Sequence, residues 1–271
     1  MHAVRIQAVE VPAIGLGTWQ MNGEACREGV RHALQAGYRH IDTAQMYGNE
    51  EQVGQGIRDA GVDRDAIFLT TKLNAGALAP ERVGPETEAS LRRLGTDRVD
   101  LLLIHWPHPA IPLAATLDAM RRVVDDGKAT HIGVSNFPSG MLREAIREAP
   151  ILTNQVEYHP LLAQDRLLAV CREEDVLLTA YSPLAKGRIL DEVELKEVAE
   201  AHGRTVGQIA LRWLVQQDRV AAVPKSASPQ RREENLAVFD FTLTDEEMAR
   251  ITALARSERL INPSFAPDWE R

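Results

Sequence analysis

Short apolar runs rich in β-branched residues recur along the chain, and a longer stretch with helical periodicity follows each of them. Eight runs predict strands, and they read AIGLGT near 13, RHIDT near 39, IFLTTK near 67, VDLLLIHW near 99, THIGVS near 130, LTNQVE near 152, VLLTAYS near 176 and VAAVPK near 220. At a mean spacing of about 30 residues, eight strand–helix units match the size of a (β/α)8 barrel, about 250 residues. The pattern therefore predicts an α/β protein built as a single (β/α)8 TIM barrel.

Helix starts and two added elements follow from the same pattern. At least eight helices are expected, and four have recognisable starts, at Asn49, Pro80, Asp165 and Thr205. Residues 4–11, VRIQAVEV, alternate with the two-residue period of a strand and predict a short N-terminal β-hairpin. Thr244 and Glu247 have the spacing of a capping box and predict an extra C-terminal helix. Because no linker or shift of composition divides the chain, we expect residues 1–271 to form one domain.

A doubly wound sheet is the alternative architecture for alternating strands and helices. Gly15 and Gly17 form a Gly-x-Gly at the first predicted strand, but position 20 is Gln, so the G-x-G-x-x-G dinucleotide fingerprint is absent. The barrel is therefore favoured.

Composition narrows the setting. The 271 residues are 44% hydrophobic and 26% charged, which is enough apolar material for a full core. A net charge of −8 without a cluster of Lys and Arg argues against a nucleic acid surface. The two cysteines, Cys26 and Cys171, both fall in helical patterns, so they predict buried thiols in a reducing cytoplasm rather than a disulfide framework. With no signal-peptide pattern and no run near the roughly 18 apolar residues of a membrane span, we expect a soluble, cytoplasmic protein.

Polar side chains gather where the predicted strands end, which is where a barrel of this type carries its active site. In strand order these positions hold Trp19, Asp42, Lys72, His105, Ser135 with Asn136, Gln155, Tyr181 with Ser182, and Lys225 with Ser226. Taken singly, each has an ordinary explanation: Asp42 could cap the next turn, and His105 could be a core imidazole. Together, an ionised Asp42 and Lys72 in a barrel mouth are costly unless they pair, which indicates a functional site.

The strand-end motifs also carry a resemblance to a known family. GLGTWQ, DTAQMYGNE, FLTTKL, VDLLLIHWP, GVSNF, NQVEYHP, AYSPLAKG and VPKSASPQRREEN follow one another over almost the whole chain. In order and content they resemble the motifs of the aldo-keto reductases. The tail RLINPSFAPDW, residues 259–269, is similar to that of the bacterial subgroup containing 2,5-diketogluconate reductase B and methylglyoxal reductase.

The resemblance implies a catalytic centre, which consists here of Asp42, Tyr47, Lys72 and His105. Carbonyl reduction needs a proton at oxygen, and a phenol can supply it if its pKa, normally about 10, is brought toward working pH. We expect the Lys72 ammonium to favour proton release from Tyr47, and Asp42 to hold Lys72. We expect His105 to orient the carbonyl and to donate a hydrogen bond to its oxygen.

The resemblance further implies the cofactor NADP(H), bound in the barrel mouth without a Rossmann motif. Tyr181 is expected to stack on the nicotinamide ring. Ser135, Asn136 and Gln155 offer hydrogen-bonding groups suited to its carboxamide.

At the other end of the cofactor, Lys225, Ser226 and Arg231 border a helix start, where a phosphate binds well. The resemblance implies that this stretch receives the 2′-phosphate of NADP, so NADPH is favoured over NADH. The resemblance implies that Glu234 and Asn235 face the adenine. The full set of predicted cofactor-binding residues is Gly17, Thr18, Asp42, Ser135, Asn136, Gln155, Tyr181, Ser182, Leu184, Lys225, Ser226, Ser228, Arg231, Glu234 and Asn235.

The expected reaction is NADPH-dependent reduction of small aldehydes, ketones or dicarbonyls, such as methylglyoxal or 2,5-diketogluconate. The predicted substrate-binding residues are Trp19, Tyr47, His105 and Trp106. In KLNAGAL, Asn74 and small residues follow Lys72 where many relatives have a bulky aromatic, which leaves one wall undefined. The loop after His105 and the tail are short, so we expect an open mouth.

Two other functions stay open: a regulatory NADP-binding barrel without catalysis, and a lyase or isomerase barrel in which Lys72 forms an imine. A metal site is not expected, because Pro107 and Pro109 keep His105 and His108 off a common helical face. The resemblance favours a monomer with a small-molecule substrate, and no nucleic acid or membrane partner is expected.

Overall fold

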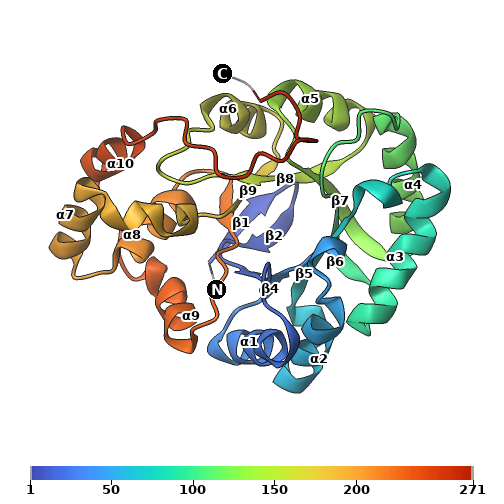
Figure 1. Ribbon diagram of the computed structural model, residues 1–271, viewed down its shortest axis with the longest axis horizontal. Helices are drawn as coiled ribbons and strands as arrows, with labels where there is room; N and C mark the ends of the chain where they lie inside the picture. The colour runs from blue at the N-terminus through green and yellow to red at the C-terminus, as the bar shows by residue number, and fades with distance from the viewer. Residues whose placement is uncertain (1, 270–271) are drawn as a thin grey trace.

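Eight parallel strands form a closed barrel in the computed structural model, which describes residues 2–269 (Figure 1). The strands are β3 (Leu16–Gly17), β4 (His40–Asp42), β5 (Phe68–Leu73), β6 (Val99–Ile104), β7 (Ala129–Ser135), β8 (Ile151–Glu157), β9 (Leu177–Tyr181) and β10 (Val220–Ala222). Each pairs with the next in sequence order. Parallel bridges from Ile14 to Ala222 and from Gly17 to Lys225 join the last strand to the first. The predicted (β/α)8 barrel and its eight strands are confirmed.

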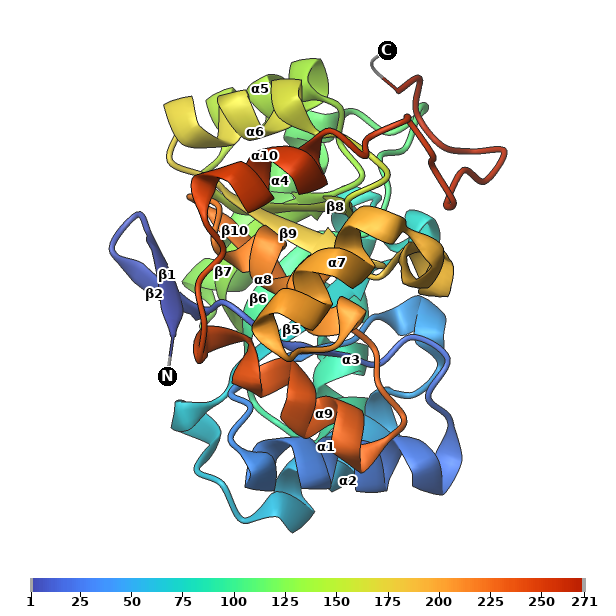
Figure 2. The same cartoon turned by 90° about the vertical axis from the view of Figure 1, so that its left-hand side faces the viewer.

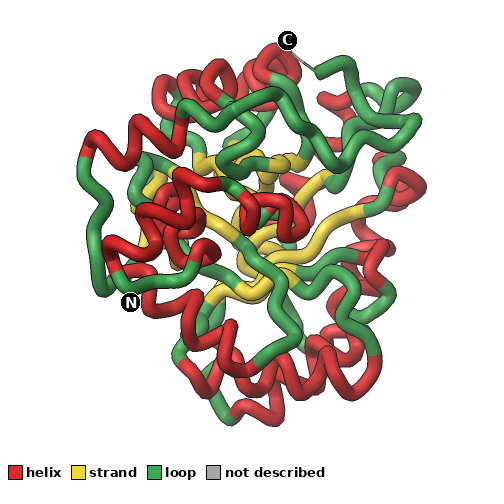
Figure 3. Tube along the Cα trace, turned by 60° about the vertical axis from the view of Figure 1, so that its left-hand side comes forward, coloured by secondary structure: helices red, strands yellow, loops and turns green. Residues whose placement is uncertain are grey.

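Helices surround the strands on the outside of the barrel (Figure 3). They are α1 (Gly23–Ala36), α2 (Glu50–Ala60), α3 (Pro80–Leu94), α4 (Leu113–Asp125), α5 (Ser139–Glu148), α6 (Asp165–Glu173), α7 (Val193–His202), α8 (Val206–Val215), α9 (Pro229–Leu236) and α10 (Asp245–Thr252). The starts predicted at Asn49, Pro80 and Thr205 are confirmed. The start predicted at Asp165 is confirmed as well, because Asp165 is the first residue of α6 just as Pro80 is the first residue of α3.

The predicted additions at both ends of the chain are present. Strands β1 (Ala3–Ile6) and β2 (Val9–Pro12) form an antiparallel hairpin. Its Ile6 and Val11 are buried with residues such as Leu101 and Leu177 from inside the barrel, so the hairpin plugs one end. Helix α10 begins with the predicted capping box of Thr244 and Glu247. Figure 2 shows the hairpin and the C-terminal segment at opposite ends of the barrel. The mouth is the end away from the hairpin, where the barrel strands terminate.

Two glycines at the first barrel strand lie too close to their neighbours to carry a side chain. A Cβ on Gly17 would lie 2.6 Å from the carbonyl oxygen of Val223, and one on Gly15 would lie 2.7 Å from the ring of His40. Contacts this short exclude any side chain. Gly17 therefore allows the first strand to close against the last, and Gly15 leaves room for the ring of His40 from β4.

The two cysteines are free and buried, as predicted. Burial raises the pKa of each thiol to about 12, so neither is a reactive thiolate. Among the helices of residues 2–269, none combines the length and the apolar character that crossing a bilayer requires.

Candidate active site

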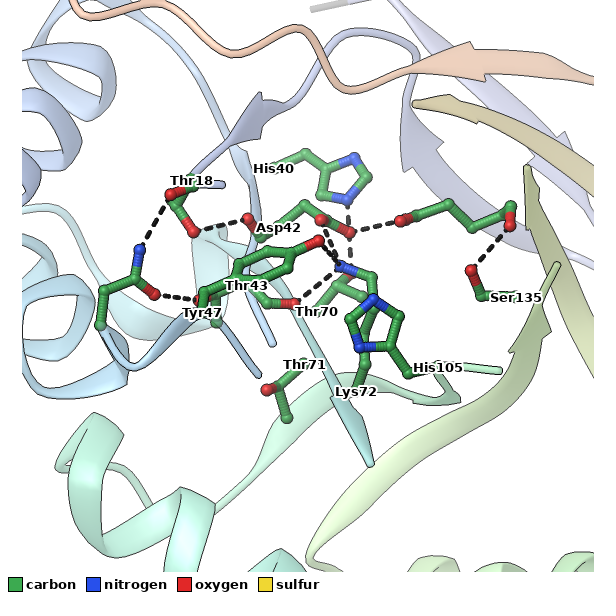
Figure 4. Close-up of polar contacts among 12 residues, drawn as sticks. Thr18, His40, Asp42, Thr43, Tyr47, Thr70, Thr71, Lys72, His105 and Ser135 are labelled. Carbon is green, nitrogen blue, oxygen red and sulfur yellow. Dashed lines mark hydrogen bonds and ion pairs between the residues drawn. The ribbon is translucent and has the colours of Figure 1, made fainter. Parts of the chain in front are cut away.

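Lys72 lies at the centre of a buried polar cluster in the barrel mouth (Figure 4). Its side chain has 0% exposure. The ammonium Nζ donates to Oδ1 of Asp42 at 2.5 Å, to the carbonyl oxygen of Thr43 at 2.8 Å and to the hydroxyl oxygen of Tyr47 at 3.2 Å. The carboxylate and the phenol predicted from sequence therefore both lie within hydrogen-bonding distance of the predicted ammonium.

Local geometry explains this convergence. Asp42 ends β4 and is level with Thr70 of β5, so Lys72 lies two residues further along on the same face of the sheet. Its long side chain reaches back to the carboxylate. Tyr47 ends the short 3₁₀ turn Gln45–Tyr47, which Gly48 terminates with a left-handed φ of 66°. The turn carries the phenol back over the strand ends.

A second strand contact completes the setting of Asp42. Nε2 of Gln155, on β8, donates to Oδ2 of Asp42 at 2.6 Å. Both carboxylate oxygens are thus hydrogen bonded, which is the condition under which a buried ion pair is tolerated. Gln155 was predicted only as a cofactor contact, and its bond to Asp42 was missed, as was the role of the Thr43 carbonyl.

Burial and neighbouring charges shift the pKa values of the cluster in opposite directions. Burial lowers the pKa of Lys72, but Asp42 and Tyr47 outweigh it and the net pKa is raised, so the ammonium stays charged. Burial raises the pKa of Tyr47 by more than the Lys72 charge lowers it. Lys72 thus lowers the pKa of Tyr47, as expected, but by too little to offset the effect of burial. With its pKa raised, Tyr47 is a neutral phenol, and the Lys72 ammonium contacts its hydroxyl oxygen.

His105 directly follows β6 and faces Tyr47, with the two ring centroids 5.7 Å apart in an edge-to-face arrangement. It is 7% exposed. Burial, with a smaller contribution from the Lys72 charge, lowers the pKa of His105 to about 3. The imidazole is neutral at physiological pH and has one N–H to donate. Its Nδ1 is buried and has no hydrogen-bond partner in the part of the chain that the structure describes.

The two tryptophans predicted as walls of the mouth differ sharply in exposure. Trp19 is 46% exposed and its ring lies 4.9 Å from that of Tyr47, so it can flank a ligand at the phenol. Trp106 is 6% exposed, because Phe265 and Trp269 pack against it with ring centroids 5.4 and 6.2 Å away. The tail, residues 259–269, covers this side of the mouth, which we had expected to be open.

The predicted nicotinamide contacts form one hydrogen-bonded group. Tyr181 donates to Oδ1 of Asn136 at 2.8 Å, and Nδ2 of Asn136 donates to Ser135 Oγ and to the His105 carbonyl oxygen. Asn136 is held in a left-handed conformation, with φ 65°. The Ser135 hydroxyl donates to the Gln155 carbonyl oxygen. Because these bonds use the donors of Ser135 and Asn136, what remains for a carboxamide is acceptor oxygens and the second N–H of Gln155.

The predicted phosphate-binding residues gather at the start of α9. Lys225 and Arg231 are exposed there. Ser228 is the N-cap, and its hydroxyl accepts the backbone N–H of Arg231. Ser226 is mostly buried and its hydroxyl donates to the Ser228 carbonyl oxygen. Two exposed cations at a capped helix start suit a phosphate group.

The other predicted cofactor contacts have more varied surroundings. Glu234 accepts a hydrogen bond from the side chain of Gln230, and Asn235 is buried. Thr18 is buried and donates to the Asp42 carbonyl oxygen. Ser182 has a left-handed φ of 48°, and Leu184 is partly buried. Within residues 2–269, no group of three His, Cys, Asp or Glu side chains is placed to hold a metal ion.

A buried carboxylate holds the tail, residues 259–269, in place. The sequence analysis did not single it out. Glu157, the last residue of β8, is fully buried and accepts the backbone N–H groups of Leu260 and Ile261 at 2.8 and 2.9 Å. It also contacts Nε2 of the buried His159 at 3.0 Å. The sequence signal was available, because Glu157 lies two residues after Gln155 and so shares its face of the strand.

Comparison with known proteins agrees with this fold. Residues 13–256 match the profile of the Aldo/keto reductase family. The chain belongs to this family, and the predicted family resemblance is confirmed.

Individual relatives cover nearly the whole chain. A glyoxal reductase of Bacillus subtilis is 42% identical, over 93% of this chain and 92% of the relative. The methylglyoxal reductase DkgB of Yersinia pestis is 36% identical, over 97% of this chain and 100% of the relative. A solved structure described as a 2,5-diketo-D-gluconic acid reductase B has a TM-score of 0.98 and 44% identity, with 100% of this chain and 98% of that chain covered.

Proposed function

We propose that this protein reduces small aldehydes, ketones or dicarbonyls to alcohols with NADPH, and that Tyr47 supplies the proton. One observation carries the proposal: the buried Lys72 ammonium contacts the Tyr47 hydroxyl oxygen at 3.2 Å while Asp42 holds it from the other side. A neutral phenol beside a fixed positive charge is a proton donor whose conjugate base is stabilised in advance.

Each residue of the cluster has a distinct part in the step. Tyr47 donates its proton to the carbonyl oxygen as negative charge develops there. Lys72 stabilises the phenolate, and Asp42 keeps Lys72 charged and in place. The neutral imidazole of His105 faces Tyr47 and donates a hydrogen bond to the same carbonyl oxygen, which orients the substrate. The phenolate is then reprotonated from solvent.

A bound nicotinamide cofactor supplies the hydride that adds to the carbonyl carbon. In our proposal Tyr181 stacks on its ring, while Ser135, Asn136 and Gln155 contact its carboxamide through their remaining acceptors and donor. Lys225, Ser226 and Arg231 receive the 2′-phosphate of NADPH at the start of α9. Ser228 serves by capping that helix. The other cofactor contacts predicted from the sequence remain part of the proposal.

The proposed substrate class rests on similarity to named reductases and on the apolar walls of the barrel mouth. Relatives are named as reductases of glyoxal and of methylglyoxal, so small dicarbonyls are the first substrates to test. Trp19 offers an exposed apolar wall beside Tyr47, and we assign Trp106 to the wall beneath the tail. We further propose a monomer of one domain that works in the cytoplasm.

Two alternatives make different predictions. A lyase that forms an imine through Lys72 needs a neutral amine, whereas the pKa of Lys72 is raised by Asp42 and Tyr47 against the effect of burial. Borohydride added with substrate would trap an adduct on Lys72 in a lyase and none in the proposed reductase. A regulatory barrel would bind NADPH without turning over any carbonyl.

The direct test is NADPH oxidation by the wild-type protein against a panel of methylglyoxal, glyoxal, 2,5-diketogluconate and 4-nitrobenzaldehyde, with NADH run in parallel. The proposal predicts turnover of at least one dicarbonyl and a higher kcat/KM with NADPH than with NADH. Tight NADPH binding with no turnover of any panel member would favour the regulatory barrel.

A further inference from the structure

A buried guanidinium lies behind the candidate phosphate-binding residues. Arg232, on α9, is 3% exposed. Its Nη1 donates to the carbonyl oxygen of Ser226 at 3.0 Å, and its Nε contacts Nδ1 of His32 at 3.3 Å. No carboxylate of residues 2–269 lies within ion-pair distance of it, and the neighbouring Glu233 contacts His32 instead, at 3.5 Å.

The position of Arg232 is fixed from several sides. The hydroxyl of the buried Tyr38 donates to the backbone carbonyl oxygen of Arg232 at 3.0 Å. The contacts from exposed Glu233 through His32 to Arg232 and on to Ser226 link the outer surface of the barrel to the buried end of the turn. The guanidinium is therefore held in one place by its surroundings.

Stability alone does not account for a cation here. Burial lowers the pKa of Arg232, which shows that the surroundings disfavour its charge. An apolar side chain of similar length would fill the same space without that cost. A buried charge without a carboxylate partner is more readily explained by an anion that binds nearby.

The residues around Ser226 fit such an anion. Lys225 and Arg231 are exposed on the outer side of the turn, and the Ser228 N-cap opens α9. The nearest carboxylates are engaged elsewhere, Glu233 with His32 and Glu234 with Gln230. With Arg232 behind them, three cations surround one turn, and a doubly charged phosphate group matches them best.

We propose that Arg232 is a positioning residue that makes the site selective for the 2′-phosphate of NADP over the free hydroxyl of NAD. It acts in two ways: its bond to the Ser226 carbonyl oxygen aligns the turn from Lys225 to Ser228, and its charge adds to that of the two exposed cations. This inference rests on the NADPH site proposed above. It assigns the selectivity to a buried residue behind the exposed cations Lys225 and Arg231.

Calorimetric titration of the nucleotide-free protein with NADP⁺, NAD⁺ and 2′,5′-ADP tests the inference without relying on turnover. Arg232→Met keeps the length and removes the charge and both hydrogen bonds. We expect it to weaken NADP⁺ and 2′,5′-ADP about tenfold and NAD⁺ by less than about threefold. Arg232→Lys keeps the charge and should recover part of the NADP⁺ affinity.

Arg212→Met is the matched control. Arg212, on α8, is partly buried. Like Arg232, it donates to a backbone carbonyl oxygen, that of Val238, and has its pKa lowered by burial. We expect it to leave both affinities unchanged. The melting temperature of nucleotide-free Arg232→Met should stay at or above that of the wild type, because an unpaired buried charge is removed.

Equal weakening of NADP⁺ and NAD⁺ in Arg232→Met, with a lowered melting temperature and no recovery in Arg232→Lys, would show a purely structural role and overturn the inference. Unchanged NADP⁺ affinity in Arg232→Met would also overturn it while leaving the proposed function intact. A wild-type protein that binds neither nucleotide would contradict both proposals.

Discussion

The side-chain amide of Gln155 donates to Oδ2 of Asp42 at 2.6 Å, which joins β8 to β4 across the barrel mouth. Because Lys72 occupies the other oxygen of the same carboxylate, Gln155 orients the ion pair that contacts Tyr47. A residue predicted as a cofactor contact thus also contacts the proposed catalytic cluster.

Substitution of Gln155 should therefore lower kcat. A hydrogen bond to a charged group contributes about 1.5–3 kcal/mol, so Gln155→Met should reduce kcat about ten- to a hundredfold. Gln155→Glu places a second carboxylate against Asp42 and should reduce it further. Steady-state kinetics with methylglyoxal give the ranking, and equal kcat in the wild type and Gln155→Met would show that the bond does not orient the cluster.

Breaking the buried ion pair should separate stability from activity. Lys72→Met leaves the Asp42 carboxylate buried without its cation, which we expect to cost about 3–5 kcal/mol of unfolding free energy. The double variant Asp42→Asn with Lys72→Met removes both charges and should regain much of that stability but no activity. Urea unfolding and turnover of the two variants measure these effects, and a double variant as unstable as Lys72→Met would contradict the assignment.

The rate of reduction should be insensitive to pH where Tyr47 stays protonated. Burial holds the pKa of Tyr47 above its ordinary value of 10.0 despite Lys72, so the proton-donating form predominates below that pH. We expect kcat for reduction to be flat from about pH 6 to about pH 9 and to fall only above the pKa of Tyr47. A fall in kcat near pH 8 under saturating cofactor would contradict a neutral phenol in the folded protein.

His105 should make the protein less stable in mild acid. Burial, with the Lys72 charge, lowers the folded-state pKa of His105 to about 3, below the ordinary 6.5 of the unfolded chain. Between these values only the unfolded state takes up the proton, so stability is lost as pH falls. The loss is about 1.4 kcal/mol for each pH unit below about 6.5. Unfolding of His105→Gln should depend less on pH from 6 to about 4.5, and an unchanged pH dependence would place the folded pKa near its ordinary value.

The hydrogen bonds that hold the tail to Glu157 should affect KM more than kcat. Glu157→Gln weakens the bonds to Leu260 and Ile261, which frees the segment that covers Trp106. We expect KM for methylglyoxal to rise about three- to tenfold while kcat changes by less than about threefold. Acrylamide quenching of tryptophan fluorescence should increase. Asp268→Asn, at an exposed position on the same tail, is the control. Equal effects in both variants would argue against a specific role for the bonds to Glu157.

The sequence predicted the barrel and the cluster of polar residues at its mouth for the same physical reason. Apolar runs define the strands, and closure of a parallel barrel brings all their C-terminal ends to one rim, so Asp42, Lys72 and His105 meet there. Tyr47 follows because its turn begins two residues after the strand-end motif. Such convergence depends on topology alone.

Other parts of the site depend on long-range packing and were not predictable. Glu157 and Leu260 are 103 residues apart, and no periodicity relates them. The direction of the pKa shift of Tyr47 follows from the balance of burial and charge, which requires coordinates. Arg232 was not singled out from the sequence, although it lies four residues before Leu236 and so on the inward face of α9.

The central claim is that Tyr47, beside the Lys72 ammonium, donates the proton, and Tyr47→Phe tests it most directly. The matched control is Tyr158→Phe, which removes a hydroxyl that bonds to Gln217 outside the cluster. The measurement is single-turnover reduction of methylglyoxal by each variant preloaded with NADPH, with NADPH affinity determined separately. We predict a rate about a hundredfold or more below wild type for Tyr47→Phe, with NADPH affinity within about twofold and Tyr158→Phe unchanged. A wild-type rate in Tyr47→Phe would contradict the account.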